Sequence, residues 1–472
     1  MPFARTIAGR PAWDRGVLDR LVQRFGDRAA RSASVLEQHG GGEGLRDQRP
    51  PDLVVFPANE EEVCEIVRLC AQAHAPIVPF GVGTSLEGHV QALAGGVCID
   101  LSRMDALIEV DPAALDCRVQ AGMTREALNH ALRDQGLFFP VDPGANATLG
   151  GMASTRASGT TTIRYGAMRD LVLGLSVVRP DGTLIRTGGR ARKSATGYDL
   201  TGLYVGAEGT LGVITQAQLR LFGIPEEIAA AVCQFPWTAA AVDTVVAVLQ
   251  AGVAIARIEL LDQLQMQACI AHGKLEGYEG RPSLFMEFHG SPSAIAGQVA
   301  EVEAIAGSFG GDGFRWVRAT EDRNRLWKAR HNAYYAALAL SPGRQAFATD
   351  ACVPISRLAQ CIAETQADAA ESGLICPIVG HVGDGNFHAV VLFDPENAAE
   401  RARADAFAER VARRAIAHGG ACSGEHGIGV HKLGLMQAQH GAALDQMRAV
   451  KRALDPLNIM NPGKTVPGAF EP

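Results

Sequence analysis

Two short segments near the end of the chain carry histidines and a glutamate between glycines, a combination that can bind a metal ion. One reads GHVGDGNFH and contains His381 and His388; the other reads SGEHGIG and contains Glu425 and His426. Imidazole and carboxylate groups are suitable ligands for Zn²⁺ or Mn²⁺. Such a metal ion could lower the pKa of a bound hydroxyl group, and a neighbouring histidine could then remove the proton. Three ligands and one spare base are therefore expected, with Asp384 either supporting the ligands or forming the turn.

Three glycine-rich segments in the first half of the chain could let a phosphate-containing ligand approach the backbone closely. They begin at Pro79 (PFGVGTS), at Asp142 (DPGANATLGGMAS) and at Gly206 (GAEGTLGVIT). Glycine has no Cβ atom, so the backbone N–H groups of such a loop can contact a phosphate directly. Each segment alone is also compatible with a plain tight turn. A G-x-G-x-x-G sequence that opens a helix after a strand is absent, which disfavours an NAD-dependent dehydrogenase.

Both helices and strands are expected around the glycine-rich segments. Apolar residues at helical spacing predict a helix over 14–25. Farther along, the strand DLVVFP, a helix that begins after Asn59 and a strand over 75–79 form a strand–helix–strand unit that leads into the first glycine loop. The dipeptide Asp181-Gly182 predicts a hairpin turn between two β-branched runs.

After Pro225 the pattern changes to strand, helix, strand, strand, helix, strand, which is the order of a ferredoxin-like cap. Two further strands are expected over 346–353 and 375–381, within a stretch that is otherwise rich in helices. The expected organisation has four parts, which are an N-terminal helical segment over 1–48, a glycine-rich domain over 49–225, a cap domain with the metal site over 226–454, and a tail over 455–472 that returns to the glycine-rich domain.

Composition and charge exclude several classes of protein. The chain of 472 residues has a formal net charge of −7 and lacks a Lys/Arg run that could bind nucleic acid. Its ten cysteines never form C-x-x-C, which argues against zinc knuckles and iron–sulfur clusters. We find no apolar run as long as a membrane span, and the first residues lack the apolar core of a secretory signal. A cytoplasmic location is expected, with peripheral attachment to the inner membrane as the alternative.

The motifs together resemble a known flavoprotein superfamily. The three glycine-rich segments, in this order and spacing, resemble the FAD domain of the vanillyl-alcohol-oxidase (PCMH-type) superfamily over about Arg49 to Pro225. The segments GHVGDGNFH and SGEHGIG, followed by NIMNPGK, look like its D-2-hydroxyacid dehydrogenase branch, and most like the cytochrome-type D-lactate dehydrogenases. The similarity spans about Arg24 to Lys464. It implies an α+β fold with a two-part PCMH-type FAD-binding domain, a ferredoxin-like α/β cap and a helical C-terminal region.

The resemblance also implies an activity. An FAD-dependent dehydrogenase would oxidise a small D-2-hydroxy acid to the 2-oxo acid and pass hydride to flavin N5. The electrons would then leave for an external acceptor such as cytochrome c, a quinone or an electron-transfer flavoprotein, and a homodimer is the expected assembly. A zinc hydrolase could use the histidine and glutamate cluster, but it would leave the three glycine-rich segments unexplained. A non-catalytic FAD- or metal-binding sensor is the other alternative, and it would keep the fold without the base.

One departure from the family pattern bears on the substrate. The D-2-hydroxyglutarate branch has a lysine two residues before the aspartate of the strand that follows Arg330, where it holds the distal carboxylate. That aspartate is Asp350 here, and the residue two positions before it is Ala348. A monocarboxylate, D-lactate first, is therefore expected, with D-2-hydroxyglutarate or glycolate as the alternative.

The resemblance also implies roles for individual residues. His381, His388 and Glu425 would bind the divalent metal, His426 would be the general base, and two further residues would place the substrate: Arg330 through a bidentate fork to its carboxylate, and Asn386. Loop residues Thr84 and Ser85 stand where some members attach FAD through a histidine, and His89 falls beyond that loop, so non-covalent FAD is expected. The residues expected to line FAD are Pro79, Gly81, Val82, Gly83, Thr84, Ser85, Pro143, Leu149, Gly150, Ser154, Gly159, Tyr165, Gly166, Glu208, Gly209, Ile214 and Asn461.

Overall fold

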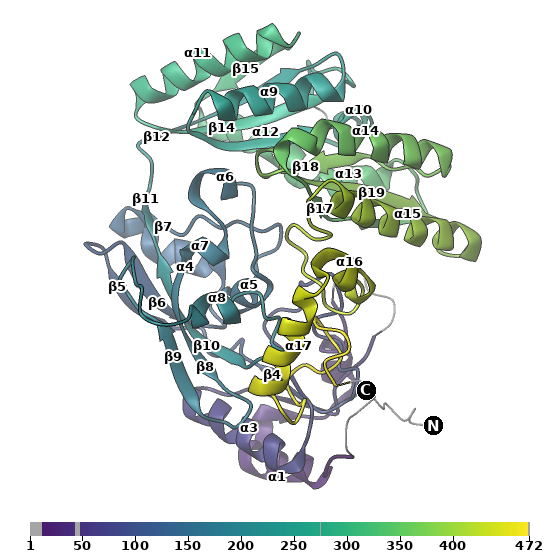
Figure 1. Ribbon diagram of the computed structural model, residues 1–472. Helices are drawn as coiled ribbons and strands as arrows, with labels where there is room; N and C mark the ends of the chain where they lie inside the picture. Colours follow the sequence, from purple (N-terminus) through teal and green to yellow (C-terminus); the bar gives the residue numbers. More distant parts are fainter. Residues whose placement is uncertain (1–11, 43–47, 274, 471–472) are drawn as a thin grey trace. The chain divides into compact units, whose positions relative to one another are not determined.

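The computed structural model describes residues 12–42, 48–273 and 275–470, and the chain divides into two compact units (Figure 1). Unit 1 contains residues 1–158, 166–224 and 425–472, and unit 2 contains residues 159–165 and 225–424. The short segment 159–165 thus belongs to unit 2, although the residues on both sides of it belong to unit 1. The opening MPFARTIAGRP, to which the expectation about a leader refers, lies outside the described residues, as do residues 43–47 of the expected helical segment.

The first sheet of unit 1 has four strands in the order β1-β2-β4-β3. Strands β2, β4 and β3 are parallel, and β1 pairs antiparallel with β2. Helix α3 connects β2 to β3 and begins after Asn59, whose side chain accepts a hydrogen bond from the backbone N–H of Glu62. The predicted strand–helix–strand unit is confirmed. The bounds are β1 (Ala29–Ala30), β2 (Leu53–Val55), α3 (Glu60–Ala73), β3 (Ile77–Phe80) and β4 (Val97–Asp100).

The second sheet of unit 1 has five strands in the order β5-β6-β10-β8-β9, all antiparallel. The predicted hairpin between β8 and β9 is confirmed, and Gly182 has a φ of +77° at its turn. A two-stranded sheet of β7 and β11 completes the β-structure described in this unit. The bounds are β5 (Leu107–Asp111), β6 (Asp116–Gln120), β7 (Leu137–Phe138), β8 (Val172–Val178), β9 (Leu184–Gly188), β10 (Val213–Arg220) and β11 (Phe222–Gly223).

One hydrophobic core joins the two larger sheets of unit 1, and it includes Ile459 and Met460 of the C-terminal tail. The tail lies beside β3, where Ile77 donates to the carbonyl of Ile459 at 2.7 Å and accepts from Asn461 at 2.8 Å. The predicted first helix is confirmed as α1. Besides α3, the α-helices described in this unit are α1 (Gly16–Phe25), α2 (Ala33–Gln38), α4 (Arg125–Leu132), α5 (Leu149–Thr155), α7 (Met168–Leu171), α8 (Leu200–Tyr204), α16 (Met436–His440) and α17 (Ala443–Leu454).

Unit 2 is built on one eight-stranded antiparallel sheet with the order β15-β12-β14-β13-β18-β19-β16, and β17 pairs with β19. Alternate residues of its strands point to opposite faces, and each face has its own hydrophobic core. The bounds are β12 (Glu227–Gln234), β13 (Ile255–Leu261), β14 (Ser283–Gly290), β15 (Asp312–Val317), β16 (Gln345–Ala348), β17 (Ala351–Cys352), β18 (Ile378–Gly380) and β19 (Asn386–Phe393).

Helices cover both faces of this sheet (Figure 1). One face packs against α9, α11, α14 and α15, and the other against α10, α12 and α13. The bounds are α6 (Thr162–Tyr165), α9 (Thr238–Gln250), α10 (Gln263–Gly273), α11 (Pro292–Ser308), α12 (Thr320–His331), α13 (Ala333–Ala339), α14 (Ile355–Glu371) and α15 (Ala398–Ala417). Helix α6 comes from the short segment 159–165.

The predicted order strand, helix, strand, strand, helix, strand is confirmed as β12, α9, β13, β14, α11 and β15, but α10 stands unpredicted between β13 and β14. The predicted strand over 346–353 is interrupted after Ala348 and forms β16 and β17. The predicted strand over 375–381 is shorter and forms β18. Among the described residues, we find no helix that is both long and apolar enough to cross a membrane.

Candidate active site

The two histidines of the GHVGDGNFH segment lie close together in unit 2. His381 directly follows β18 and precedes a short 3₁₀ helix, and His388 lies on β19. Their ring centroids are 5.4 Å apart, with the rings nearly perpendicular. Gly385 makes this turn possible, because it has a φ of +78° and a Cβ atom there would lie 2.1 Å from the carbonyl oxygen of Val353.

Each histidine is held through its Nδ1 atom by an acceptor that sequence analysis did not single out. His381 Nδ1 lies 2.8 Å from Oε1 of Glu259, and His388 Nδ1 lies 2.9 Å from the carbonyl oxygen of Thr349. A carbonyl oxygen only accepts, so Nδ1 of His388 carries the hydrogen. In this tautomer the lone pair of each neutral ring is on Nε2. An outer acceptor that fixes the tautomer in this way is typical of histidines that bind metal ions.

Glu259 lies in the middle of β13 and also contacts Arg330. Arg330 donates from Nε (3.0 Å) and Nη2 (2.6 Å) to Oε2 of Glu259. Burial alone would raise the pKa of Glu259, but His381 and Arg330 outweigh burial and hold that pKa below its ordinary value. One edge of the Arg330 guanidinium is therefore taken by Glu259. A substrate carboxylate would have to use the other edge.

Asn386 begins β19 and is buried. Its Nδ2 donates to Oδ1 of Asp350 at 2.8 Å and to the carbonyl oxygen of Ala351 at 3.0 Å. Its Oδ1 is buried and has no hydrogen-bond partner in the described part of the chain. Both amide hydrogens are thus used by the protein, and Oδ1 is the atom of Asn386 that can accept a hydrogen bond from a ligand.

The second predicted segment begins at the boundary between the units. Ser423 and Gly424 are the last residues of unit 2. Ser423 Oγ donates to Oδ2 of Asp350 at 2.6 Å, and a Cβ atom on Gly424 would overlap the side chain of Asn386. Glu425 and His426 follow directly and belong to unit 1. The structure thus brings His381 and His388 together within unit 2 and places the predicted third ligand one peptide bond beyond that unit.

His426 lies beside a buried carboxylate of unit 1, Glu87, that sequence analysis missed. His426 Nδ1 is 3.8 Å from Oε1 of Glu87. The same oxygen lies 3.1 Å from Nζ of Lys432, and the other carboxylate oxygen, Oε2, lies 3.4 Å from Nδ1 of His431. Burial alone would raise the pKa of Glu87, but His431, Lys432 and His426 outweigh it and lower that pKa. Glu87 lies two residues beyond the first glycine-rich segment, and nothing in the sequence pattern links it to a histidine far along the chain.

The residues expected at the phosphate loop fit a phosphate-containing cofactor. The loop follows β3, and Gly83 has a φ of +73°. A Cβ atom on Gly81 would lie 2.2 Å from Oγ1 of Thr148, so glycine is required where this loop meets the second glycine-rich segment. Ser85 Oγ is buried without a hydrogen-bond partner in the described part of unit 1, as expected of an atom that binds a ligand.

The third glycine-rich segment is tied to the C-terminal part of unit 1. Glu208 is buried, and its carboxylate accepts hydrogen bonds from the backbone N–H groups of Ile428 and Gly429 and from Thr465 Oγ1. Burial alone would raise the pKa of Glu208, but His89 first, and then the hydrogen bonds from Ile428 and Thr465, lower it to about 2. Asn461 donates to the carbonyl oxygens of His89 and Glu208. Glu208 and Asn461 thus hold two distant parts of unit 1 together.

The remaining residues of the expected FAD set fall in both units. Gly159 and Tyr165 belong to unit 2, and Tyr165 Oη lies 2.7 Å from His289 Nδ1. Ser154 Oγ donates to the carbonyl oxygen of Gly150 in helix α5. The others lie in unit 1 and are Pro79, Val82, Thr84, Pro143, Leu149, Gly166, Gly209 and Ile214.

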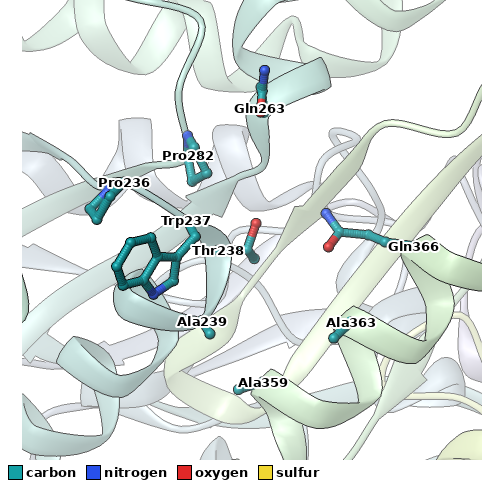
Figure 2. A pocket seen from close by; sticks show the side chains of 9 residues that line it. All are labelled: Pro236, Trp237, Thr238, Ala239, Gln263, Pro282, Ala359, Ala363 and Gln366. Carbon is teal, nitrogen blue, oxygen red and sulfur yellow. The ribbon is translucent and has the colours of Figure 1, made fainter.

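A separate hollow of about 340 Å³ lies in unit 2, and Figure 2 shows the side chains that line it. Trp237, Gln263 and Gln366 are among them, and no lining residue is charged. None of the predicted site residues lines this hollow. We therefore do not assign the chemistry to it.

Comparisons with known proteins identify the family. Residues 224–465 match the family model described as FAD linked oxidases, C-terminal domain, and residues 51–188 match the model described as FAD binding domain. The chain belongs to the FAD-linked oxidase family. The predicted FAD cofactor and the predicted class of FAD-dependent oxidoreductase are confirmed.

Two relatives and one solved structure illustrate the family. The chain is 50% identical to a Danio rerio protein named probable D-lactate dehydrogenase, mitochondrial, over 99% of this chain and 95% of the relative. It is 43% identical to an Arabidopsis thaliana protein named D-lactate dehydrogenase [cytochrome], mitochondrial, over 88% and 74%. The crystal structure of p-cresol methylhydroxylase with substrate bound is 18% identical and matches with a TM-score of 0.76, covering 97% of this chain and 98% of that chain. That likeness confirms the predicted α+β, PCMH-type fold.

These comparisons correct one expectation. The expected cytoplasmic location is wrong, because both relatives carry mitochondrial in their names. The expectation depended on the lack of a secretory signal and of an apolar run. Neither absence distinguishes the cytoplasm from a mitochondrial compartment.

Proposed function

We propose that this FAD-linked oxidase acts in mitochondria and oxidises D-lactate to pyruvate with the help of a divalent metal ion. The pair of histidines in unit 2 carries the proposal, since both rings are held through Nδ1 and the buried Arg330 lies next to them through Glu259. Metal and arginine are the two cations that a 2-hydroxy carboxylate needs. The names of the two relatives support the choice of D-lactate.

The metal ion would be held by His381, His388 and Glu425. The tautomers of both histidines suit a metal ligand, and Glu425 follows a segment anchored to Asp350 and Asn386. When bound, Zn²⁺ or Mn²⁺ would lower the pKa of the substrate hydroxyl. Asn386 Oδ1 would accept a hydrogen bond from the substrate, and the outer edge of Arg330 would bind the carboxylate.

His426 would accept the hydroxyl proton as general base, and the carboxylate of Glu87 lies 3.8 Å from its Nδ1. FAD, when bound, supplies the acceptor for hydride at flavin N5. The loop from Gly81 to Ser85 would hold the pyrophosphate without a covalent link, and the rest of the expected FAD set would line the ring system and ribose. Each turnover would thus move one hydride from the substrate carbon to the flavin and one proton to His426, and the electrons would leave for cytochrome c.

A monocarboxylate is favoured over D-2-hydroxyglutarate. Ala348 ends β16, where the D-2-hydroxyglutarate branch has a lysine, and its methyl group offers no charge to a second carboxylate. A distal carboxylate left without a cation would be bound poorly. The predicted homodimer stays a prediction.

The test is anaerobic flavin reduction by a panel of D-lactate, L-lactate, glycolate and D-2-hydroxyglutarate, followed by turnover with cytochrome c. We expect a yellow protein that D-lactate bleaches fastest. A higher kcat/KM for D-2-hydroxyglutarate than for D-lactate would overturn the substrate assignment. A protein that binds flavin but is bleached by no hydroxy acid would overturn the proposed activity.

A further inference from the structure

Glu259 is a buried carboxylate whose two oxygens contact two residues with different proposed tasks. It is only 1% exposed. Oε1 accepts from His381, a proposed metal ligand, and Oε2 accepts twice from Arg330, the proposed anchor of the substrate carboxylate. No motif of the sequence includes Glu259, and the proposed mechanism gives it no step.

The charges of this cluster limit what Arg330 can do alone. The carboxylate of Glu259 carries one negative charge and the guanidinium of Arg330 one positive charge, while a neutral His381 adds none. Both charged groups are buried, so each strongly offsets the field of the other. The attraction for an incoming carboxylate must therefore depend on a further positive charge, such as a metal ion bound by His381 and His388.

We propose that Glu259 is a positioning residue that couples the metal ion to the substrate carboxylate. It fixes the tautomer of His381 for the metal, and it neutralises Arg330 so that a carboxylate binds tightly only when the metal is present. This inference rests on the proposed metal site. It predicts that removing the charge of Glu259 weakens the binding of the metal ion but strengthens the binding of a carboxylate in the metal-free protein. A general loss of structure would weaken both.

A second cluster of the same residue types provides the control. Glu287 on β14 accepts from His289 Nε2 at 2.7 Å and lies 3.3 Å from Nε of Arg257. Glu287 is buried like Glu259 and, by strand alternation, points to the same face of the sheet. Its histidine contacts Tyr165 through the other ring nitrogen, so His289 has no lone pair left for a metal ion.

The experiment compares Glu259→Gln with Glu287→Gln in FAD-containing enzyme stripped of metal by a chelator. Titration with Mn²⁺ should show an affinity about 10–100-fold weaker than wild type for Glu259→Gln, the range typical when the partner of a metal-binding histidine is removed. Oxamate, a monocarboxylate analogue of pyruvate, should bind metal-free Glu259→Gln about tenfold more tightly than metal-free wild type, because Arg330 is then an uncompensated buried charge. Glu287→Gln should change neither affinity.

Glu259→Asp keeps the negative charge but has a side chain one methylene shorter. It serves as the second variant if Glu259→Gln does not fold. It should bind Mn²⁺ weakly and bind oxamate in the metal-free state no more tightly than wild type. If Mn²⁺ and oxamate affinities fall together in Glu259→Gln, or neither changes, the coupling role is wrong. If wild type binds no Mn²⁺ or Zn²⁺ yet is bleached by D-lactate, the metal part of the proposed function fails instead, and the coupling fails with it.

Discussion

The sheet of unit 2 has on one face two clusters of arginine, glutamate and histidine, each with a buried carboxylate. The His381 cluster consists of Arg330, Glu259 and His381, and the His289 cluster consists of Arg257, Glu287 and His289. In both clusters the carboxylate bonds to the imidazole and contacts the guanidinium. The clusters differ in which ring nitrogen faces the carboxylate. His381 uses Nδ1, and His289 uses Nε2.

The strands explain this difference. Glu287 and His289 are two residues apart on β14, so they point to the same face and the ring lies beside its own strand. Glu259 and His381 come from different strands, and His381 stands just beyond the end of β18, where the chain is free to turn. The remaining nitrogen of His289 then meets Tyr165 at 2.7 Å. Two clusters of the same residue types thus present different ring nitrogens to their carboxylates, so residue composition alone does not identify a metal site.

The largest effect should come from removing one histidine of each cluster. His381→Ala should lose its metal ion and most of its activity, because the stabilisation that a metal ion provides is worth several kcal/mol, or about 10³–10⁵-fold in rate. His289→Ala should keep the metal. Metal content by mass spectrometry and flavin reduction by D-lactate measure both. Equal metal loss in the two variants would contradict the contrast between the clusters.

The proposed proton acceptor, His426, belongs to neither cluster. His426→Ala should keep flavin and metal but reduce its flavin about 10²–10⁴-fold more slowly, as is typical when a general base is lost. Its neighbour Glu425→Ala should instead lose metal. Stopped-flow flavin reduction and metal content, measured side by side, separate the two. If His426→Ala is reduced by D-lactate at the wild-type rate, the base is elsewhere.

A smaller effect is expected at the end of β16. Ala348→Lys would place a cation two residues before Asp350, which should improve D-2-hydroxyglutarate about tenfold relative to D-lactate, since one added charge contact is worth about 1–3 kcal/mol. Ala348→Met is the matched control, because it adds length without charge. The ratio of kcat/KM for the two substrates is the measurement. An equal change in both variants would show that length, and not charge, matters.

Much of the fold follows from sequence periodicity, but two details of unit 2 do not. Helix α10 was missed because its sequence QLQMQACIAHG has no clear apolar stripe, although Gln265 and Met266 are both buried. The strand expected over 346–353 is interrupted, because Asp350 turns its carboxylate to Asn386 and Ser423, and the carbonyl of Thr349 accepts from His388. Such contacts between distant residues leave no periodic signal.

The sequence identifies the histidines that lie in glycine-flanked motifs. It does not identify the residues that hold those histidines in place. His381 and His388 stand out in the sequence, whereas Glu259 lies in the strand IARIELL. There Arg257 and Glu259 alternate with apolar residues, which is the pattern of a strand with one solvated face. In the structure helices cover both faces of this sheet, so Glu259 is buried, Arg257 is half-buried, and both are paired. The signal that could have identified Glu259 is a charged residue on a strand that is expected to lie between two layers of helices.

The smallest effect concerns stability in acid. The pKa of Glu287 is lowered in the folded protein because Arg257 and His289 outweigh burial, which alone would raise it. A carboxyl group with a lowered folded-state pKa stabilises the fold at pH values above its ordinary pKa of 4.5 and loses this contribution as the pH falls through its folded value. The neutral amide of Glu287→Gln has no such dependence. The free energy of unfolding of wild type should therefore exceed that of Glu287→Gln most at pH 6–7. This difference should shrink as the pH falls below about 4.5, by about 1.4 kcal/mol in total for each unit by which the folded-state pKa is lowered.

Urea unfolding of both proteins between pH 7 and 3.5 measures this difference. A difference that stays constant over the whole range would mean that Glu287 stabilises the sheet by packing alone, and that its bonds to His289 and Arg257 do not depend on its charge.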